Sequence, residues 1–166
     1  MKILGLDPGL RYTGWGLIEA SGNRLRFLGC GRIAVPENLE LAERLAFLHR
    51  ALETVFAETQ PEAAAVEETF SNVNAKSTLK LGMARGVVML APALAQIPVA
   101  EYPANVVKKT VTGAGHAAKE QIQAMVKILL PQSDFENADA ADALAVAICH
   151  AHHAQTAQKT TERIKA

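Results

Sequence analysis

Cysteine is nearly absent from this chain of 166 residues, which contains only Cys30 and Cys149. The two lie far apart in the sequence and lack metal-site spacing, so we expect neither a disulfide nor a thiolate metal centre. Both are predicted to be buried apolar residues in a reducing compartment. No run approaches the roughly 20 apolar residues of a membrane span, and the opening "MKILGLDPG" lacks the apolar region of a signal peptide. These absences predict a cytoplasmic protein.

A net charge of either sign is also missing, because 17 Lys and Arg balance 17 Asp and Glu. The balance hides a division along the chain. Residues 36–68 carry eight acids and two bases, a net charge of −6, whereas residues 71–130 carry seven bases and two acids, a net charge of +5. A basic half is typical of proteins that meet a polyanion on one side, although solvated charged helix faces produce similar counts.

The hydrophobic pattern predicts one α/β domain over residues 1–154, followed by a polar C-terminal tail over residues 155–166. Alternating or continuous apolar runs between turn residues predict strands, and apolar residues at helical spacing predict helices. Strands are expected at residues 2–7, 12–20, 24–35, 63–70 and 98–102. Helices are expected at about residues 39–58 and 75–95, from about 103, through 119–130, and from about 138.

Four acids occupy unusual places in this plan. Asp7 ends the first strand and Glu67 lies near the end of the fourth, so both emerge at one edge of the sheet if those strands are parallel. Asp139 and Asp142 are three residues apart and therefore share one face of the last helix. The apolar remainder of that helix predicts docking against the sheet, which would bring the four carboxylates together.

Such a cluster predicts a divalent metal site. Carboxylates in close contact raise one another's pKa and take up protons unless cations keep them ionised. A set of oxygen ligands without cysteine or histidine suits Mg²⁺ or Mn²⁺. Two such ions, roughly 3.5 to 4 Å apart, would clamp the attacking and leaving oxygens of a phosphodiester during hydrolysis.

Each acid also has a simpler interpretation. Asp7 precedes a Pro-Gly turn, Asp139 could be the N-cap of the last helix, and Asp142 could interact with the helix dipole. Glu68 stands beside Glu67, and the pattern leaves open which of the two points inward. The joint arrangement favours the metal site over the separate explanations.

Six stretches stand in order between residue 3 and about residue 150: "GLDPGLRYTGWG", "AVEETF", "KSTLKLGMARGV", "VKKTVTGAG", "KEQIQAMV" and "ADAADALAVAI". Together they resemble the signature blocks of the RuvC Holliday-junction resolvases. The resemblance implies an RNase H-like fold of the retroviral-integrase superfamily, with a mixed five-stranded sheet flanked by helices. It implies a Mg²⁺-dependent endonuclease that resolves four-way DNA junctions by symmetric paired nicks in recombination and repair. It also implies a homodimer that works with the branch-migration proteins RuvA and RuvB.

Carried over residue by residue, the resemblance makes Asp7, Glu67, Asp139 and Asp142 the catalytic, metal-binding carboxylates, and so selects Glu67 over Glu68. Lys108 and Lys119 match lysines that the family places near the DNA backbone. RuvC enzymes carry an aromatic residue close to the junction centre at the position of Phe70. By composition alone Phe70 would be a core residue, but its place three residues after Glu67 also suits stacking on an unpaired base.

Other basic and small residues allow two interpretations each. Lys76 and Lys80 lie four residues apart on one predicted helix and therefore share a face of it. These two lysines, and Arg85 on the same helix, either contact phosphate or are simply solvated. Gly82 and Gly86 on that helix allow close packing, either in a dimer or within the monomer.

Histidines are clustered near the C-terminus at positions 150, 152 and 153, where we expect solvent-exposed side chains. His116 follows a glycine turn and is a candidate for phosphate contact rather than for catalysis.

Two other functions fit parts of the sequence. The "DPGLRYTGWG" turn also resembles the phosphate turn of actin-like ATPases and sugar kinases, but those proteins need two such lobes and 166 residues supply one. A junction-binding module without catalysis would need the basic half but not four aligned acids. Nucleotide binding would indicate the first alternative, and binding without nicking the second.

Overall fold

The computed structural model describes residues 1–68 and 74–165, and only the backbone of residues 157–165. Its strands are β1 (Lys2–Asp7), β2 (Tyr12–Ser21), β3 (Arg24–Ala34), β4 (Ala63–Glu68) and β5 (Val99–Pro103). Its helices are α1 (Leu41–Thr59), α2 (Ala75–Leu94), α3 (Ala104–Thr112), α4 (Lys119–Leu129) and α5 (Ala138–Lys165). The predicted elements are therefore present within a few residues of their expected bounds. The exception is the end of the fourth strand, where Thr69 and Phe70 lie outside the described residues.

The five strands form one mixed sheet in the order β3-β2-β1-β4-β5. β2 is antiparallel to both of its neighbours, β1 and β3, whereas β4 is parallel to both β1 and β5. The predicted mixed five-stranded sheet is confirmed, and so is the condition that the first and fourth strands run parallel. The carboxyl ends of β1 and β4 consequently meet at one edge of the sheet.

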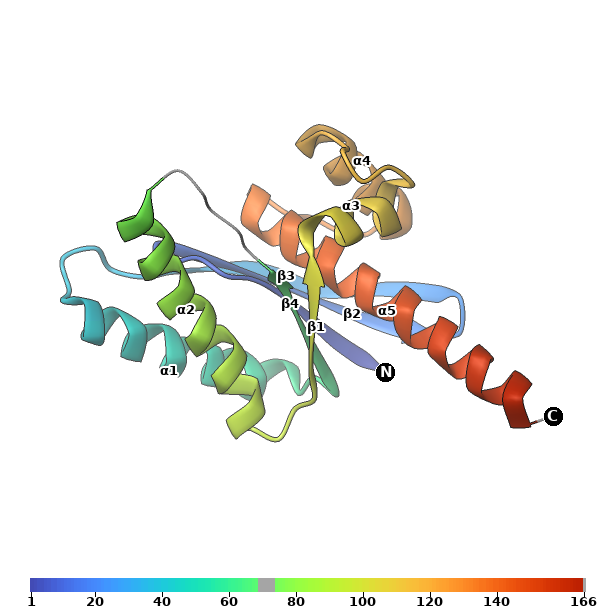
Figure 1. Ribbon diagram of the computed structural model, residues 1–166, viewed down its shortest axis with the longest axis horizontal. Helices are drawn as coiled ribbons and strands as arrows, with labels where there is room; N and C mark the ends of the chain where they lie inside the picture. The colour runs from blue at the N-terminus through green and yellow to red at the C-terminus, as the bar shows by residue number, and fades with distance from the viewer. Residues whose placement is uncertain (69–73, 166) are drawn as a thin grey trace.

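Helices cover both faces of the sheet (Figure 1). One face packs against α1 and α2 through a core that includes Leu6, Leu48 and Val88. The other face packs against α3, α4 and α5 through a core that includes Ile18, Val126 and Ile148. The strands are buried from both sides, which is why β1 and β4 have nearly continuous apolar sequences.

Helix α5 lies directly on the centre of the sheet. A Cβ atom added to Gly5 of β1 would stand 2.0 Å from the carbonyl oxygen of Ala143, so glycine is required where strand and helix cross. The facing surface of the helix is rich in fully buried alanines, which bring its backbone close to the strands. This close approach sets where the first turn of α5 stands relative to β1 and β2.

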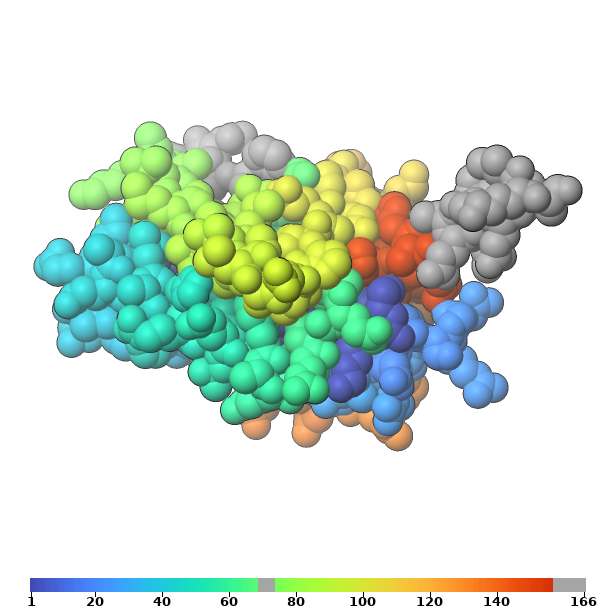
Figure 2. Space-filling view, turned by 90° about the horizontal axis from the view of Figure 1, so that it is seen from below, coloured from blue at the N-terminus to red at the C-terminus, as the bar shows by residue number. Residues whose placement is uncertain are grey.

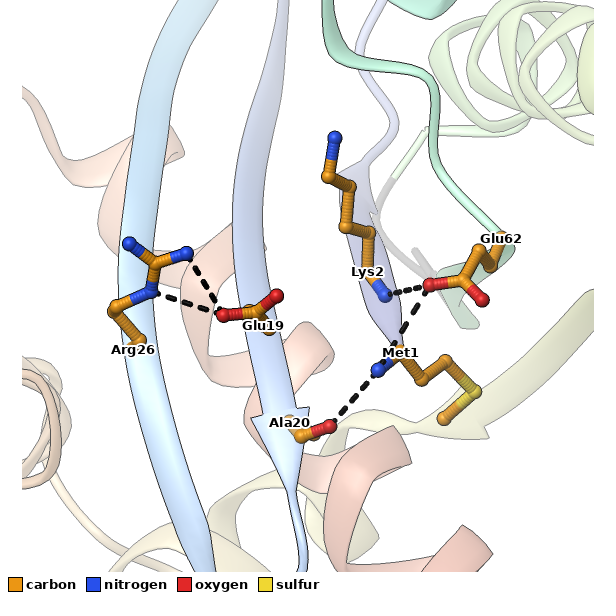
Figure 3. Close-up of polar contacts among 6 residues, drawn as sticks. All are labelled: Met1, Lys2, Glu19, Ala20, Arg26 and Glu62. Atoms are coloured by element: carbon orange, nitrogen blue, oxygen red, sulfur yellow. Dashed lines mark hydrogen bonds and ion pairs between the residues drawn. The ribbon is translucent and has the colours of Figure 1, made fainter.

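Polar contacts tie the strands at the edge of the sheet opposite the carboxyl ends of β1 and β4 (Figure 3). The Glu62 carboxylate accepts a hydrogen bond from the backbone N–H of Lys2 at 2.6 Å, linking the start of β4 to β1. Arg26 of β3 pairs with Glu19 of β2 across the hairpin at 2.8 Å. Because the latter pair is half exposed, its contribution to stability is small, of order 0–1 kcal/mol.

One expectation, the burial of both cysteines, needs correction. Cys149 is fully buried as predicted, but Cys30 is only half buried, because its strand lies at the open side of the sheet. The polar residues expected to form a tail continue α5 as far as Lys165, so the boundary between residues 154 and 155 stays a prediction. Among the helices that the structure describes, none combines the length and apolar character needed to cross a membrane.

Candidate active site

The functional side chains of the sheet stand on one row across its strands. Asp7 of β1 pairs with Gly14 of β2, which in turn pairs with Arg32 of β3. On the other side, Glu67 follows Val66, the partner of Leu6, so Glu67 comes level with Asp7. Residues of one row point to the same face, and this row faces α5. Strand alternation therefore turns Glu67 toward the helix and Glu68 away from it.

Helix α5 supplies the remaining two acids from its first two turns. Asn137 precedes the helix, and its side-chain oxygen accepts a hydrogen bond from the backbone N–H of Ala140 at 2.9 Å. Asn137 is thus the N-cap, and the interpretation of Asp139 as the cap is wrong. A Cβ on Gly14 would lie 2.0 Å from the carbonyl oxygen of Asp139, so the helix start rests directly on β2.

A cleft of about 300 Å³ opens beside these acids. Its lining includes three of the four predicted carboxylates, two of the four predicted DNA-contacting lysines and an apolar wall from α3, α4 and α5. These lining residues are Asp7, Glu67, Asp142, Lys108, Lys119, Ala104, Val107, Ile122 and Ala145. Asp139 lies outside this lining, on the side of Gly14, where it pairs with Arg32 at 3.6 Å.

Burial and mutual repulsion raise the pKa values of the two strand acids. Desolvation raises the pKa of Asp7 to about 8, with further contributions from the charges of Glu67, Asp142 and Asp139. Desolvation followed by repulsion from Asp142 raises the pKa of Glu67 to about 7, against the opposing charges of Lys108 and Lys119. The site therefore favours either protonation or a cation, as expected for clustered carboxylates.

Lys119 places a positive charge among the acids. Its Nζ lies 2.9 Å from the Asp142 carboxylate, and this hydrogen bond is the largest cause that raises the pKa of Lys119. Lys119 begins α4, so the loop before that helix sets how far the ammonium reaches toward α5. The same side chain thus contacts a carboxylate and lines the cleft.

The residues present fit a hard divalent cation. All four acids offer carboxylate oxygens, and no thiolate or imidazole lines the cleft among the described residues. Within the described part of the chain, no three acidic, His or Cys side chains converge closely enough to bind one ion as they stand. Side-chain rotations would therefore be needed to bring three of these carboxylates onto one ion.

The other predicted contact residues lie apart from the cleft. Lys76 and Lys80 are exposed on α2, which covers the opposite face of the sheet. Arg85 is not free for phosphate, because it pairs with Glu101 of β5. Phe70 lies outside the described residues, so its role stays a prediction.

The C-terminal histidines are not all exposed, as the sequence had suggested. His150 is half buried, and its Nδ1 lies 2.9 Å from the hydroxyl of Tyr102. The ring of His153 stacks on the same tyrosine with centroids 5.2 Å apart. Burial lowers the pKa of His150, which disfavours a charge on this ring where it packs between α5 and β5.

The sequence patterns alone did not indicate that Asn137, Gly14 and Arg32 contribute to this site. Asn137 precedes the last helix, where an N-cap is expected, and so was detectable. Gly14 and Arg32 become noticeable only when the strand register is known, since the register puts them beside Asp7 and Asp139.

In the absence of metal, thermal stability is expected to fall as the pH rises from about 5 to about 9. Asp7 and Glu67 have pKa values of about 8 and about 7, above their ordinary values of 3.8 and 4.5, so the folded chain binds more protons than the unfolded chain. Their stabilising contribution is complete below the ordinary values and is lost as the pH passes through the raised ones. Calorimetry in EDTA would measure the trend.

Asp7→Asn should flatten this pH dependence, because the amide does not ionise. At pH 8 the melting temperature of the variant should be about 2–4 °C above that of the unchanged protein. This is the shift that a gain of roughly 1 kcal/mol in the free energy of unfolding produces in a chain of this size. Asp134→Asn, an exposed acid outside the cleft, is the control and should melt as the unchanged protein does. Equal pH slopes for Asp7→Asn and the unchanged protein would contradict the electrostatic assignment.

A sequence model of one family, described as "Crossover junction endodeoxyribonuclease RuvC", matches residues 3–150. A RuvC protein of Rhodopseudomonas palustris (strain BisA53) is 63% identical over 153 residues, which cover 92% of this chain and 88% of the relative.

Solved structures agree with the sequence match. The Thermus thermophilus RuvC structure superposes with a TM-score of 0.85 at 33% identity, covering 95% of this chain and 97% of that chain. The same enzyme in complex with a Holliday junction substrate gives a TM-score of 0.87 at 33% identity, covering 95% and 96%. The fold is RNase H-like, and this chain belongs to the RuvC family.

Proposed function

We propose that this chain is an endodeoxyribonuclease that resolves four-way DNA junctions by symmetric paired nicks, in homologous recombination and repair. The observation that carries the proposal is the placement of Asp7, Glu67 and Asp142 in one cleft with Lys108 and Lys119. Carboxylates suit metal ions and lysines suit phosphate, and the cleft brings the two together. The match to a RuvC enzyme in complex with a Holliday junction substrate supports the substrate class.

The RuvC family consists of metal-dependent nucleases, and for this chain we infer two Mg²⁺ ions per site, with Mn²⁺ as a substitute. Asp7, Glu67, Asp139 and Asp142 would hold them. When bound, such ions polarise the scissile phosphate and assist both the attacking and the leaving oxygen. The raised pKa values of Asp7 and Glu67 mean that metal binding near neutral pH releases protons, so affinity should rise with pH.

The chain's own lysines orient the substrate. Lys108 of α3 and Lys119 of α4 stand on the wall of the cleft opposite the sheet, where each can neutralise a backbone phosphate. The apolar side chains of Val107 and Ile122 form the same wall. A strand held between the two lysines would present its phosphate to the carboxylates.

The decisive assay uses the purified protein on a synthetic four-way junction, with Mg²⁺, with Mn²⁺ and with EDTA. We expect paired nicks with either metal and binding without nicking in EDTA. Binding without nicking under all three conditions would favour a junction-binding module. Nucleotide binding without junction affinity would favour the alternative that this chain is related in function to actin-like ATPases and sugar kinases.

Lys108→Ala is expected to weaken junction binding and to reduce its dependence on salt. Each phosphate neutralised on duplex DNA contributes about −0.9 to the slope of log K against log salt, so losing one contact should flatten the slope by about that amount. The loss should be similar for all junction sequences. Fluorescence anisotropy from about 50 to about 200 mM salt, in EDTA, measures both effects.

Lys127→Ala provides a matched control for Lys108, because Lys127 lies on α4 away from the cleft and over the ring of Phe135. Its salt slope should equal that of the unchanged protein. Lys119→Ala should also weaken binding, although it additionally frees Asp142 from its ion pair. An unchanged slope in both Lys108→Ala and Lys119→Ala would refute the phosphate assignment.

We also infer a homodimer, because one active site per chain cuts one strand and symmetric nicking needs two. Helix α2 lies at the surface of the molecule (Figure 2), and its exposed apolar side chains support this inference. Leu79, Leu90 and Leu94 are 63%, 53% and 64% exposed, and Met83 lies between them on the same stripe. A Cβ added to Gly82 or Gly86 would meet nothing within 4 Å, so these glycines do not serve packing within the described chain.

Leu90→Asp is expected to convert the dimer into a monomer at micromolar concentration, since it places a charge within the apolar stripe that the dimer would bury. Sedimentation velocity would show the change in mass. Paired nicking of one junction should be lost together with dimerisation. Ile128→Asp is the control, because Ile128 is equally exposed but lies on α4. A dimer that persists in Leu90→Asp would place the interface elsewhere.

The remaining predicted contacts follow from this assignment. We propose that Phe70 stacks on an unpaired base at the junction centre, a contact worth roughly 1 to 3 kcal/mol. Lys76 and Lys80 would reach more distant phosphates. RuvA and RuvB, as branch-migration proteins on the same junction, are the proposed partners in the cytoplasm. If Phe70 stacks, Phe70→Ala should nick more slowly and Phe70→Trp should keep much of the rate. Thermal melting of Phe70→Ala distinguishes stacking from a core role, because truncating a core phenylalanine should cost about 3 to 5 kcal/mol of stability.

A further inference from the structure

Arg32 of β3 lies beside the acidic site but on the side away from Lys108 and Lys119. It pairs in register with Gly14, the neighbour of Asp7. Because Gly14 has no side chain, the Arg32 guanidinium reaches across it to α5. There one of its terminal nitrogens lies 3.6 Å from Oδ2 of Asp139.

The Arg32 guanidinium is held in place by an aromatic ring. Its central carbon stands 4.0 Å from the centroid of the Tyr12 ring, a close cation–π stack. Tyr12 begins β2 and so is anchored in the sheet. Arg11, which also lies over this ring at 5.2 Å, is paired with Glu37 at 2.5 Å. Arg32 is therefore the arginine of this cluster that is turned toward Asp139.

The backbone of Asp139 has little freedom. Its carbonyl oxygen rests on Gly14, and Asn137 caps the first turn of the helix. What remains free is rotation of the carboxylate, and the contact with Arg32 restricts that rotation by holding Oδ2. The other oxygen is not engaged by Arg32, and the charge of Asp139 is near enough to Asp7 to raise its pKa.

We propose that Arg32, braced by Tyr12, is a positioning residue that orients the Asp139 carboxylate for Mg²⁺. The inference depends on the proposed function, because it takes Asp139 as a metal ligand. Mg²⁺ demands near-ideal octahedral geometry, so it is sensitive to the orientation of each oxygen. Groups that orient metal ligands commonly change metal affinity or activity by about 10–100-fold when removed.

The test measures Mg²⁺ binding to the free protein by titration calorimetry, together with nicking in Mg²⁺ and in Mn²⁺. Arg32→Ala should bind Mg²⁺ about 10-fold more weakly and nick proportionally more slowly in Mg²⁺. The loss in Mn²⁺ should be smaller, because Mn²⁺ tolerates less regular coordination. Junction affinity in EDTA and its salt slope should not change. Arg32→Lys should recover only part of the Mg²⁺ affinity, because an ammonium lacks the plane that stacks on Tyr12.

Arg26→Ala is the matched control, since Arg26 also lies on β3 and pairs with Glu19 of β2, far from the acids (Figure 3). Its Mg²⁺ affinity and nicking should equal those of the unchanged protein. Unaltered Mg²⁺ binding by Arg32→Ala would overturn the proposal, because the arginine would then have no effect on the site. Tighter binding would also overturn it, because the arginine would then act only through its charge. A flatter salt slope with normal Mg²⁺ binding would make it a phosphate contact and would also overturn it.

Two further variants keep the outcomes separable. If Arg32→Ala does not fold, Arg32→Lys decides, and a Mg²⁺ affinity equal to that of the unchanged protein would overturn the positioning role. Asp139→Asn tests the underlying ligand assignment. Normal Mg²⁺ binding by Asp139→Asn would remove Asp139 from the proposed site. If Asp139→Asn loses Mg²⁺ binding while Arg32→Ala binds Mg²⁺ normally, the role of Arg32 is refuted but the ligand assignment of Asp139 stands.

Discussion

Replacing any of the four acids by its amide, as Asp7→Asn, Glu67→Gln, Asp139→Asn or Asp142→Asn, is expected to lower Mg²⁺-dependent nicking more than about 100-fold. The expectation exceeds the 10–100-fold typical of residues that only support metal ligands, because each change removes a ligand itself. Junction affinity in EDTA should stay close to that of the unchanged protein, since no phosphate contact is lost. Nicking rates on a synthetic junction and anisotropy without metal measure the two quantities.

Glu68→Gln is the matched control for this series. Glu68 adjoins Glu67 on β4 but lies on the next row of the sheet, level with Pro103 rather than Tyr102, and it does not line the cleft. The variant should nick junctions at close to the unchanged rate. An inactive Glu68→Gln beside an active Glu67→Gln would reverse the assignment. Normal nicking by any one of the four amide variants would remove that residue from the proposed metal set.

The second large effect is expected from Gly14→Ala, a change that adds one methyl group and no charge. The new Cβ would stand 2.0 Å from the carbonyl oxygen of Asp139 and 3.1 Å from its Cβ. The contact involves backbone, so the first turn of α5 must move away from β2. We expect nicking to fall at least about 100-fold, because a misplacement of about 1 Å at a reacting site costs that much. Stability should fall by about 1–3 kcal/mol, as for other overpacked cores.

Gly29→Ala separates the local displacement from a general effect of alanine in the sheet. Gly29 lies on β3, where an added Cβ would meet only the ring of Trp15, at 3.6 Å or more. This variant should melt and nick like the unchanged protein. Normal nicking by Gly14→Ala would show that the start of α5 can shift without disturbing Asp139, contrary to the geometry.

Both predictions concern the junction between β1, β2 and α5, where most of the site is assembled. Two of the four acids lie on α5, one on β1 and one on β4, and the lysines come from α3 and α4. The site therefore depends on the packing of α5 on the sheet more than on any single loop. Substitutions that alter this packing should reduce catalysis before they reduce junction binding.

Local patterns were sufficient to predict the elements and their type. The alternating run 12–20 is β2, the buried run ending at Glu67 and Glu68 is β4, and the apolar segment from residue 138 is α5. Apolar periodicity and turn residues are local properties, so they can be read along the chain. The meeting of Asp7 and Glu67 at one edge also followed, once parallel pairing of their strands was assumed, and the structure confirms that pairing.

The sequence by itself thus determined the order of strands and helices, the acids that stand at their ends and the division of charge along the chain. Only the tertiary structure decided that three of the acids share one cleft with Lys108 and Lys119, and that Arg32 meets Asp139. The physical reason is that strand register and helix docking join residues more than 50 positions apart. A shift of one residue in register would turn every side chain of a strand to the opposite face.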